Sequence, residues 1–308
     1  MKKDGGIMNS KPKLSFEGLL GKFAEKKIDF GSYSKDEIIA YLRERSYYYK
    51  ISSYRKNFPK LPQNKGYDKL TFDHLVVSAN LDVRLREYLM NLTLDIEHAT
   101  RTRLMTIMTD MNEIEGYEIV EDFQDEYPER FAEILERFRH NDYKKDMFEK
   151  RTQISVWVLM EIIDYGTLIQ FLQFFSTKYP NPPEKLYTPH HKFIKNIRNS
   201  CAHNDVFLIN IFDQSYNVPR PAAAIKSFAS EMNILPALVR YRKIIDIVVL
   251  FYIHKKICSD NLNGRRYREG RLIIEKYQEN NILLSHSTSI AKLFQSVLSK
   301  CVDFLQKS

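Results

Sequence analysis

The chain has 308 residues, a formal net charge of +8 and a pI near 9.1. A chain of this length buries a full hydrophobic core without disulfide or metal staples. Its three cysteines, Cys201, Cys258 and Cys301, lie far apart and form no C-x-x-C pair, which leaves a disulfide framework or a cysteine zinc site without a starting point. A reducing cytoplasm is therefore the expected location.

The sequence shows no sign of a membrane span or a secretory signal. The longest strongly apolar run, Ile247–Ile253, is far shorter than the roughly 18 to 20 residues that a spanning helix needs. Residues 1–10 contain lysines but no apolar segment behind them. We expect them to form a disordered tail before a single domain over residues 11–308.

The basic charge makes a polyanion such as RNA a candidate partner, because phosphate contacts supply affinity that does not depend on sequence. Many basic proteins bind no nucleic acid, so charge alone leaves this open.

Helix-forming residues and apolar residues at helical spacing recur along the whole chain, with few glycines and prolines between them. No alternating β pattern, internal repeat or low-complexity segment is found, although a small hairpin near Val206–Tyr216 is an option. The fold class is therefore predicted to be all-α. In chain order, we expect helices over Ser15–Lys27, Lys35–Arg45, Asp73–Met111, Phe131–Arg139, Ser155–Phe175, His191–His203, Met232–Lys256 and Ile290–Leu305.

The segment 193–204 carries the sharpest chemical hypothesis. Ile194, Ile197 and Cys201 form a core-facing stripe at helical spacing, which leaves Arg198 and His203 off the stripe and available to solvent or a partner. Cleavage of RNA through its own 2′-hydroxyl needs a proton shuttle, which His supplies, and a cation for the charge developing on phosphate, which Arg supplies. This chemistry requires no metal.

Arginine followed five residues later by histidine is a common pattern by chance. The alternative is a helix that simply ends near His203, with the imidazole at the negative end of the helix dipole and Arg198 solvated.

Several blocks in fixed order resemble a known family. The stretch Ile197–Asn204 is similar to the R-N-x-x-A-H motif of the HEPN superfamily, and more narrowly to the Abi-like abortive-infection proteins of bacteria, the AbiD and AbiF group. The remaining similar blocks are Lys11–Glu17, Tyr41–Leu42, Ser46–Tyr54, Phe72–Asp73, Asp82–Arg86, Ile96–Thr102, Trp157, Glu161 and Gly166–Leu168.

This resemblance implies an HEPN-like helical bundle with additional N- and C-terminal helices. It implies a metal-independent endoribonuclease of an anti-phage system, without a cofactor and acting as a homodimer, with Arg198 and His203 as the catalytic pair and Asn199 as the motif's polar residue. Glu97 and Arg101 would orient the motif from a neighbouring helix, although an ordinary surface ion pair is the alternative for these two residues.

Two further clusters are candidates for RNA contacts. The aromatic run Tyr47–Tyr54 carries interleaved cations that suit base stacking, although aromatics at this spacing also suit a core. Arg265, Arg266, Arg268 and Arg271 follow an expected exposed turn at Asn261–Gly264 and suit backbone phosphates.

Two other functions remain open at this point. One is a non-catalytic RNA-binding protein that holds a structured small RNA or a partner. The other is a helical scaffold in which Arg198 and His203 only hold a dimer together.

Overall fold

The structure is a computed structural model that describes residues 12–151 and 153–306. Over these residues it is helical and its only β pairings are isolated bridges, which confirms the predicted all-α class. The tail expected over residues 1–10 lies outside the described residues. Within the described ranges, no helix is both long enough and apolar enough to cross a membrane.

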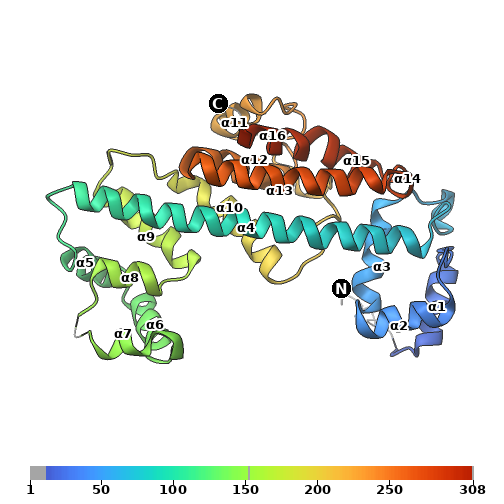
Figure 1. Ribbon diagram of the computed structural model, residues 1–308, viewed down its shortest axis with the longest axis horizontal. Helices are drawn as coiled ribbons and strands as arrows, with labels where there is room; N and C mark the ends of the chain where they lie inside the picture. The colour runs from blue at the N-terminus through green and yellow to red at the C-terminus, as the bar shows by residue number, and fades with distance from the viewer. Residues whose placement is uncertain (1–11, 152, 307–308) are drawn as a thin grey trace, which may run out of the picture.

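Helix α4, Phe72–Asp110, is the central element and runs along the long axis of the molecule (Figure 1). Its 39 residues span about 58 Å at a rise of 1.5 Å per residue. Thr71 and His74 form a capping box that fixes its start. Both of its ends lie within one residue of the predicted bounds. The other helices attach along this axis.

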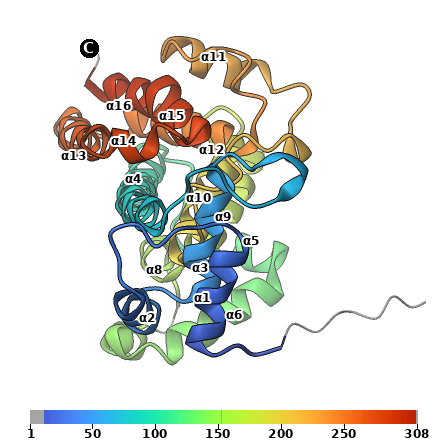
Figure 2. The ribbon, with the colours of Figure 1, turned by 90° about the vertical axis from the view of Figure 1, so that its right-hand side faces the viewer.

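Three groups of helices surround α4. Figure 2 views the molecule from one end of this axis, with α13–α16 on one side of α4 and α1–α3 on the other. The N-terminal group lies at one end and consists of α1 (Phe16–Glu25), α2 (Lys35–Glu44) and α3 (Tyr48–Ser53). A small lobe lies at the far end and consists of α5 (Glu118–Glu126), α6 (Pro128–Arg139), α7 (Lys145–Glu149) and α8 (Val156–Ile162).

The remaining helices complete the bundle around the middle of α4. They are α9 (Tyr165–Lys178), α10 (His191–Ala202), α11 (Ala223–Glu231), α12 (Arg242–Ile257), α13 (Asp260–Glu279), α14 (Asn281–Leu284), α15 (Thr288–Leu293) and α16 (Ser299–Gln306). Short 3-10 turns cover Tyr54–Asn57, Pro62–Asn64, Asp142–Lys144, Thr188–His190 and Gln214–Tyr216, and Phe294–Leu298 is a π-helical segment. Helix α10 packs against both α4 and α12, which places the motif segment at the centre of the molecule.

One predicted long helix is divided in two in the structure, and another begins ten residues later than predicted. The stretch expected over Ser155–Phe175 is α8 followed by α9, because Ile163 and Asp164 adopt extended backbone and Asp164 caps the new helix. The stretch expected from Met232 begins only at Arg242, after a loop in which Asn233 has a φ of 57°. Left-handed backbone of this kind ends a helix.

One smaller prediction was also wrong, and one option is not realised. Residues Asn261–Gly264 form the first turn of α13, capped by the Ser259 side chain, and not an exposed turn. The optional hairpin at Val206–Tyr216 is absent, because buried Phe207, Leu208 and Ile211 fix this segment as turns against the core.

Candidate functional site

Helix α10 presents the motif segment as predicted. Ile194 and Ile197 are buried, Cys201 is partly buried, and Asn199 and His203 are exposed. The side chain of Arg198 is 27 % exposed, so it lies at the edge of the core and not in open solvent. The apolar stripe therefore holds one face of the helix, and the polar motif residues lie at its border.

Glu97 joins the motif to the long helix α4. Its Oε2 accepts a hydrogen bond from Nε of Arg198 at 3.1 Å, and its Oε1 accepts one from Arg101 at 2.7 Å. The predicted pair Glu97–Arg101 thus exists, and the structure adds Arg198 as a second cation on the same carboxylate. All three side chains are at most 27 % exposed, where an ion pair is less screened than at the surface.

Arg101 is in turn fixed to the end of α8. It donates to the backbone carbonyls of Met160 at 2.6 Å and Ile163 at 2.8 Å. These carbonyls are free to accept because they lie at the end of the helix, where no following turn uses them. The position of Glu97, and through it Arg198, therefore depends on the break between α8 and α9.

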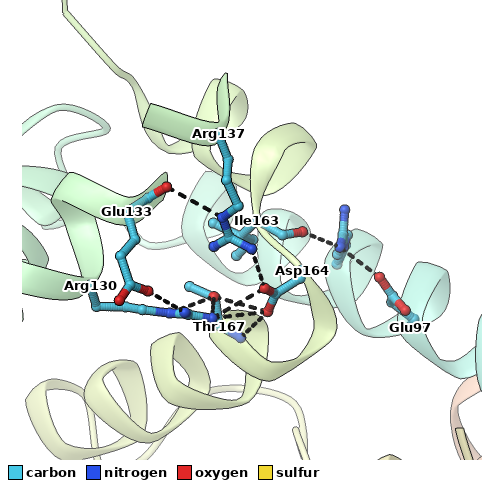
Figure 3. A network of polar contacts seen from close by, with 8 residues as sticks. Glu97, Arg130, Glu133, Arg137, Ile163, Asp164 and Thr167 are labelled. Carbon is cyan, nitrogen blue, oxygen red and sulfur yellow. Dashed lines mark hydrogen bonds and ion pairs between the residues drawn. The ribbon is translucent and has the colours of Figure 1, made fainter. Parts of the chain in front are cut away.

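Asp164, at this break, forms a second cluster of ionic contacts. Figure 3 shows Arg130 and Arg137 of α6 converging on its carboxylate, with Ile163 and Glu97 on the other side. Its Oδ1 also caps α9 by accepting from the Thr167 backbone at 2.7 Å. Burial opposes ionisation, but hydrogen bonds from Arg137 and Thr167 lower the pKa of Asp164 overall.

Tyr165 supports Arg198 from beneath. The guanidinium carbon lies 5.8 Å from the centroid of the Tyr165 ring, within the range of a cation–π contact. The Tyr165 hydroxyl lies 2.9 Å from Nδ1 of His191, and Nε2 of His191 lies 2.9 Å from the Leu186 carbonyl. Burial lowers the pKa of His191 to about 4, so this imidazole is neutral and serves as an anchor for the start of α10.

His203 lies at the point where α10 ends. Asn204 has a φ of 61°. The backbone N–H groups of Asn204 and Asp205 donate to the backbone carbonyls of Cys201 and Ser200, at 3.0 and 2.9 Å respectively. This is a Schellman motif, in which asparagine tolerates the left-handed position. Arg86 donates to the Asn204 side chain and Lys50 to its carbonyl, so the chain direction after His203 is fixed.

Asp82 was not predicted as part of the site. It is fully buried on α4 and accepts hydrogen bonds from the Tyr54 hydroxyl at 2.8 Å and from the backbone N–H of Leu208 at 2.7 Å. It also pairs with Arg86 at 3.1 Å, which reaches Asn204. The sequence could have indicated Asp82, because an ionisable residue on the apolar face of a helix is unusual. Its hydrogen-bond partners lie far away along the chain and could not be predicted.

A family model described as Abi-like protein matches residues 40–208. The chain belongs to the Abi-like protein family. The match runs from α2 through the end of α10 and includes Glu97, Arg101, Arg198 and His203. Comparisons with curated proteins and with solved structures find no match. Helices α11–α16 of this Abi-like protein lie outside the matched range.

The arginines expected to contact RNA from an exposed turn lie on α13 of the Abi-like protein and differ in environment. Arg266 is buried and pairs with Asp95 at 2.9 Å, and the same carboxylate lies 3.1 Å from buried His254. Arg265 and Arg268 are exposed, and Arg271 is half-buried. The assignment of Arg266 to RNA contacts is therefore wrong for this structure, because its guanidinium is used inside the protein.

The aromatic run Tyr47–Tyr54 is divided between core and surface. Tyr54 is 1 % exposed, whereas Tyr47 and Tyr49 are 63 % and 80 % exposed. The core interpretation therefore holds for Tyr54, while base stacking on the exposed Tyr47 and Tyr49 stays a prediction.

Proposed function

We propose that this Abi-like protein is a metal-independent HEPN-type endoribonuclease that acts in bacterial abortive infection against phage. Membership of the family supports the defence role. The observation that carries the enzymatic part is the state of Arg198. Glu97 holds its Nε and the Tyr165 ring lies 5.8 Å from its guanidinium carbon, while no partner among the described residues occupies its two terminal nitrogens.

Free, parallel terminal N–H groups on a fixed guanidinium suit two oxygens of a phosphate. His203, five residues after Arg198 at the end of α10, is exposed. The proposed reaction begins when an imidazole removes the proton of a ribose 2′-hydroxyl, and the 2′-oxygen forms a bond to the adjacent phosphorus. The bond from phosphorus to the 5′-oxygen breaks, and that oxygen takes a proton.

Arg198 would stabilise the extra negative charge on the phosphoryl oxygens while five oxygens surround the phosphorus. Exposed Asn199 would position the substrate next to it. The products are a 2′,3′-cyclic phosphate and a 5′-hydroxyl.

A homodimer is part of this proposal. On α4, beside α10, the residues Val83, Met90 and Leu94 follow one another at helical spacing, and Val83 and Leu94 are 41 % and 44 % exposed. A groove next to them is lined by Arg86, Glu87, Met90, Asn91 and Cys201. A second copy packed on this partly apolar stripe would bring two motif segments to one composite cleft.

The test is cleavage of cellular RNA in EDTA by wild type, Arg198→Ala and His203→Ala, with His140→Ala as the matched control. His140 is an exposed histidine on the lobe, with a side chain 70 % exposed. Loss of a general acid or base lowers the rate by about 10²- to 10⁴-fold, which applies to His203→Ala. Loss of one donor to the developing negative charge lowers it by about 10²- to 10³-fold, which applies to Arg198→Ala, and the control keeps cleavage. Equal cleavage by all four proteins would reject the assignment.

RNA holding without cleavage is the second candidate, favoured by Arg265 and Arg268, which are both exposed and share one face of α13. In that case His203→Ala retains RNA as wild type does. The double change Arg265→Ala with Arg268→Ala weakens RNA retention and flattens its salt dependence.

A further inference from the structure

A groove between α4 and α8 is not used by the proposed chemistry. It has a volume of about 720 Å³, which is in the range of small-ligand sites. Its lining includes His98, Arg101, Met105 and Thr106 of α4 and Trp157 and Met160 of α8. The groove therefore combines apolar surface with hydroxyl, imidazole and guanidinium groups.

Trp157 is the single tryptophan of the chain, and it is 55 % exposed. One part of its ring packs directly over Gly116, where a Cβ atom would lie 2.3 Å from the ring. Any other residue at position 116 would displace the indole. Its indole N–H has no hydrogen-bond partner among the described residues. Gly116 thus leaves room for a large aromatic ring that is half-exposed and whose N–H is not used by another described residue.

The groove is connected to the motif by direct contacts. Arg101 lines it and shares the Glu97 carboxylate with Arg198. Glu97 and Arg101 are four residues apart, about 6 Å along α4. A strand with a phosphate at Arg198 would therefore have a neighbouring nucleotide beside the groove.

The charges of the groove favour a base over a phosphate. Asp110 and Glu161 both line it, and Glu161 lies 3.9 Å from Lys144, so the Asp110 carboxylate is the group that repels an entering phosphate. The guanidinium of Arg101 is already paired with Glu97. The uncharged aromatic base is free of this repulsion, and every nucleobase has a face that stacks on an indole. His98 and Thr106 offer polar groups to the edge of such a base.

We propose that this groove binds one unpaired nucleobase of the RNA substrate, stacked on Trp157. The inference rests on the proposed ribonuclease function and specifies its substrate as RNA that is single-stranded next to the cleaved bond. A base in a duplex would first have to be unpaired to enter.

The first experiment uses the fluorescence of the single tryptophan as a direct reporter. The full-length His203→Ala variant is titrated with an unstructured RNA of about eight nucleotides. A second oligomer of the same length carries ribose-phosphate without bases. We expect saturable quenching by the RNA and none by the abasic oligomer at equal concentration. Equal quenching by both would overturn stacking, because only backbone contacts would then be present.

The second experiment changes the Trp157 side chain on which the base is proposed to stack. Trp157→Ala in the His203→Ala background is expected to weaken binding of the RNA, measured by anisotropy of a labelled oligomer, about 5- to 150-fold. Trp157→Phe keeps an aromatic face and is expected to lose less. Tyr143→Ala is the matched control, since Tyr143 is 98 % exposed on the same lobe but does not line the groove. Circular dichroism confirms that each variant is folded.

The outcomes separate this inference from the proposed function. Cleavage that requires His203, with RNA affinity unchanged in Trp157→Ala, overturns the base site and leaves the ribonuclease intact. Base-dependent quenching in a protein that cleaves no RNA supports the base site and rejects the ribonuclease. Absence of both RNA binding and cleavage overturns both, and would direct attention to a protein ligand for the groove.

Discussion

Glu97 is the residue on which the geometry of the candidate site depends most directly. It is the only carboxylate that contacts both Arg101 and Arg198 among the described residues. Without its charge, two guanidinium groups would face each other with no anion between them.

We therefore expect Glu97→Gln to lower the free energy of unfolding by about 1–3 kcal/mol and to reduce RNA cleavage. Urea denaturation and cleavage assays measure the two effects. Glu275→Gln is the control, because Glu275 is an exposed carboxylate on α13, away from the motif and from the proposed dimer contact. A Glu97→Gln protein that cleaves RNA as fast as wild type would show that Arg198 needs no such positioning.

Single residues also show which parts of the candidate site could be predicted from the sequence. Arg198 and His203 were predicted from the resemblance of their motif to a family, and the Glu97–Arg101 ion pair from the i, i+4 rule, which is a local property. The roles of Asp82 and Arg266 were not. Asp82 binds backbone groups at Phe207 and Leu208, and Arg266 binds Asp95, and neither partner is near in sequence.

At the level of elements, the break between α8 and α9 has a specific cause. Asp164 caps α9 and is held by Arg130 and Arg137, while the adjacent Ile163 carbonyl accepts from Arg101. Because α6 supplies both arginines, a pattern read along 155–175 alone predicted one continuous helix. The long helix α4 was predicted within one residue at each end, since its apolar periodicity and its cap are contained in its own sequence.

Asp164→Ala is expected to lower the free energy of unfolding by about 1–3 kcal/mol, because it removes a helix cap and an acceptor for two arginines. It should also reduce cleavage, since the Ile163 carbonyl that holds Arg101 loses its fixed position. Asp146→Ala, at an exposed carboxylate of α7, serves as the comparison in both assays. If stability falls while cleavage stays at the wild-type rate, the contacts of Asp164 are structural only.

The packing of α10 on α12 contains a second buried carboxylate, Asp246. Burial raises its pKa to about 7, against a hydrogen bond from Asn196 and the cations Arg242 and Lys243. The folded protein therefore holds a proton that the unfolded chain releases near pH 4. Stability contributed in this way is present at low pH and is lost as pH rises from about 4 to 7.

Asp246→Asn should remove this pH dependence. At pH 8 its free energy of unfolding should exceed that of wild type by at most about 4 kcal/mol, so it should unfold at a higher urea concentration. Urea denaturation at several pH values between 4 and 8 measures it. Asp125→Asn, at an exposed position of α5, should leave the pH dependence as in wild type. Parallel pH profiles for wild type and Asp246→Asn would show that this carboxylate is ionised in the folded state.

For the whole molecule, the exposed stripe on α4 is the surface proposed to join two copies. Light scattering after size exclusion should give wild type a mass of twice 36.5 kDa. Leu94→Glu should yield the monomer, because a charge would be buried in the contact. Leu272→Glu is the control, since Leu272 is 61 % exposed on α13, outside the stripe. A wild-type monomer that cleaves RNA would reject the composite cleft.

The central claim is that Arg198 and His203 cleave RNA through its 2′-hydroxyl without a metal. The most direct measurement is end-group analysis of total RNA incubated in EDTA with wild type or His203→Ala. The account predicts fragments with 2′,3′-cyclic phosphate and 5′-hydroxyl ends from wild type alone. Intact RNA in both samples, or fragments with 3′-hydroxyl ends, would contradict it.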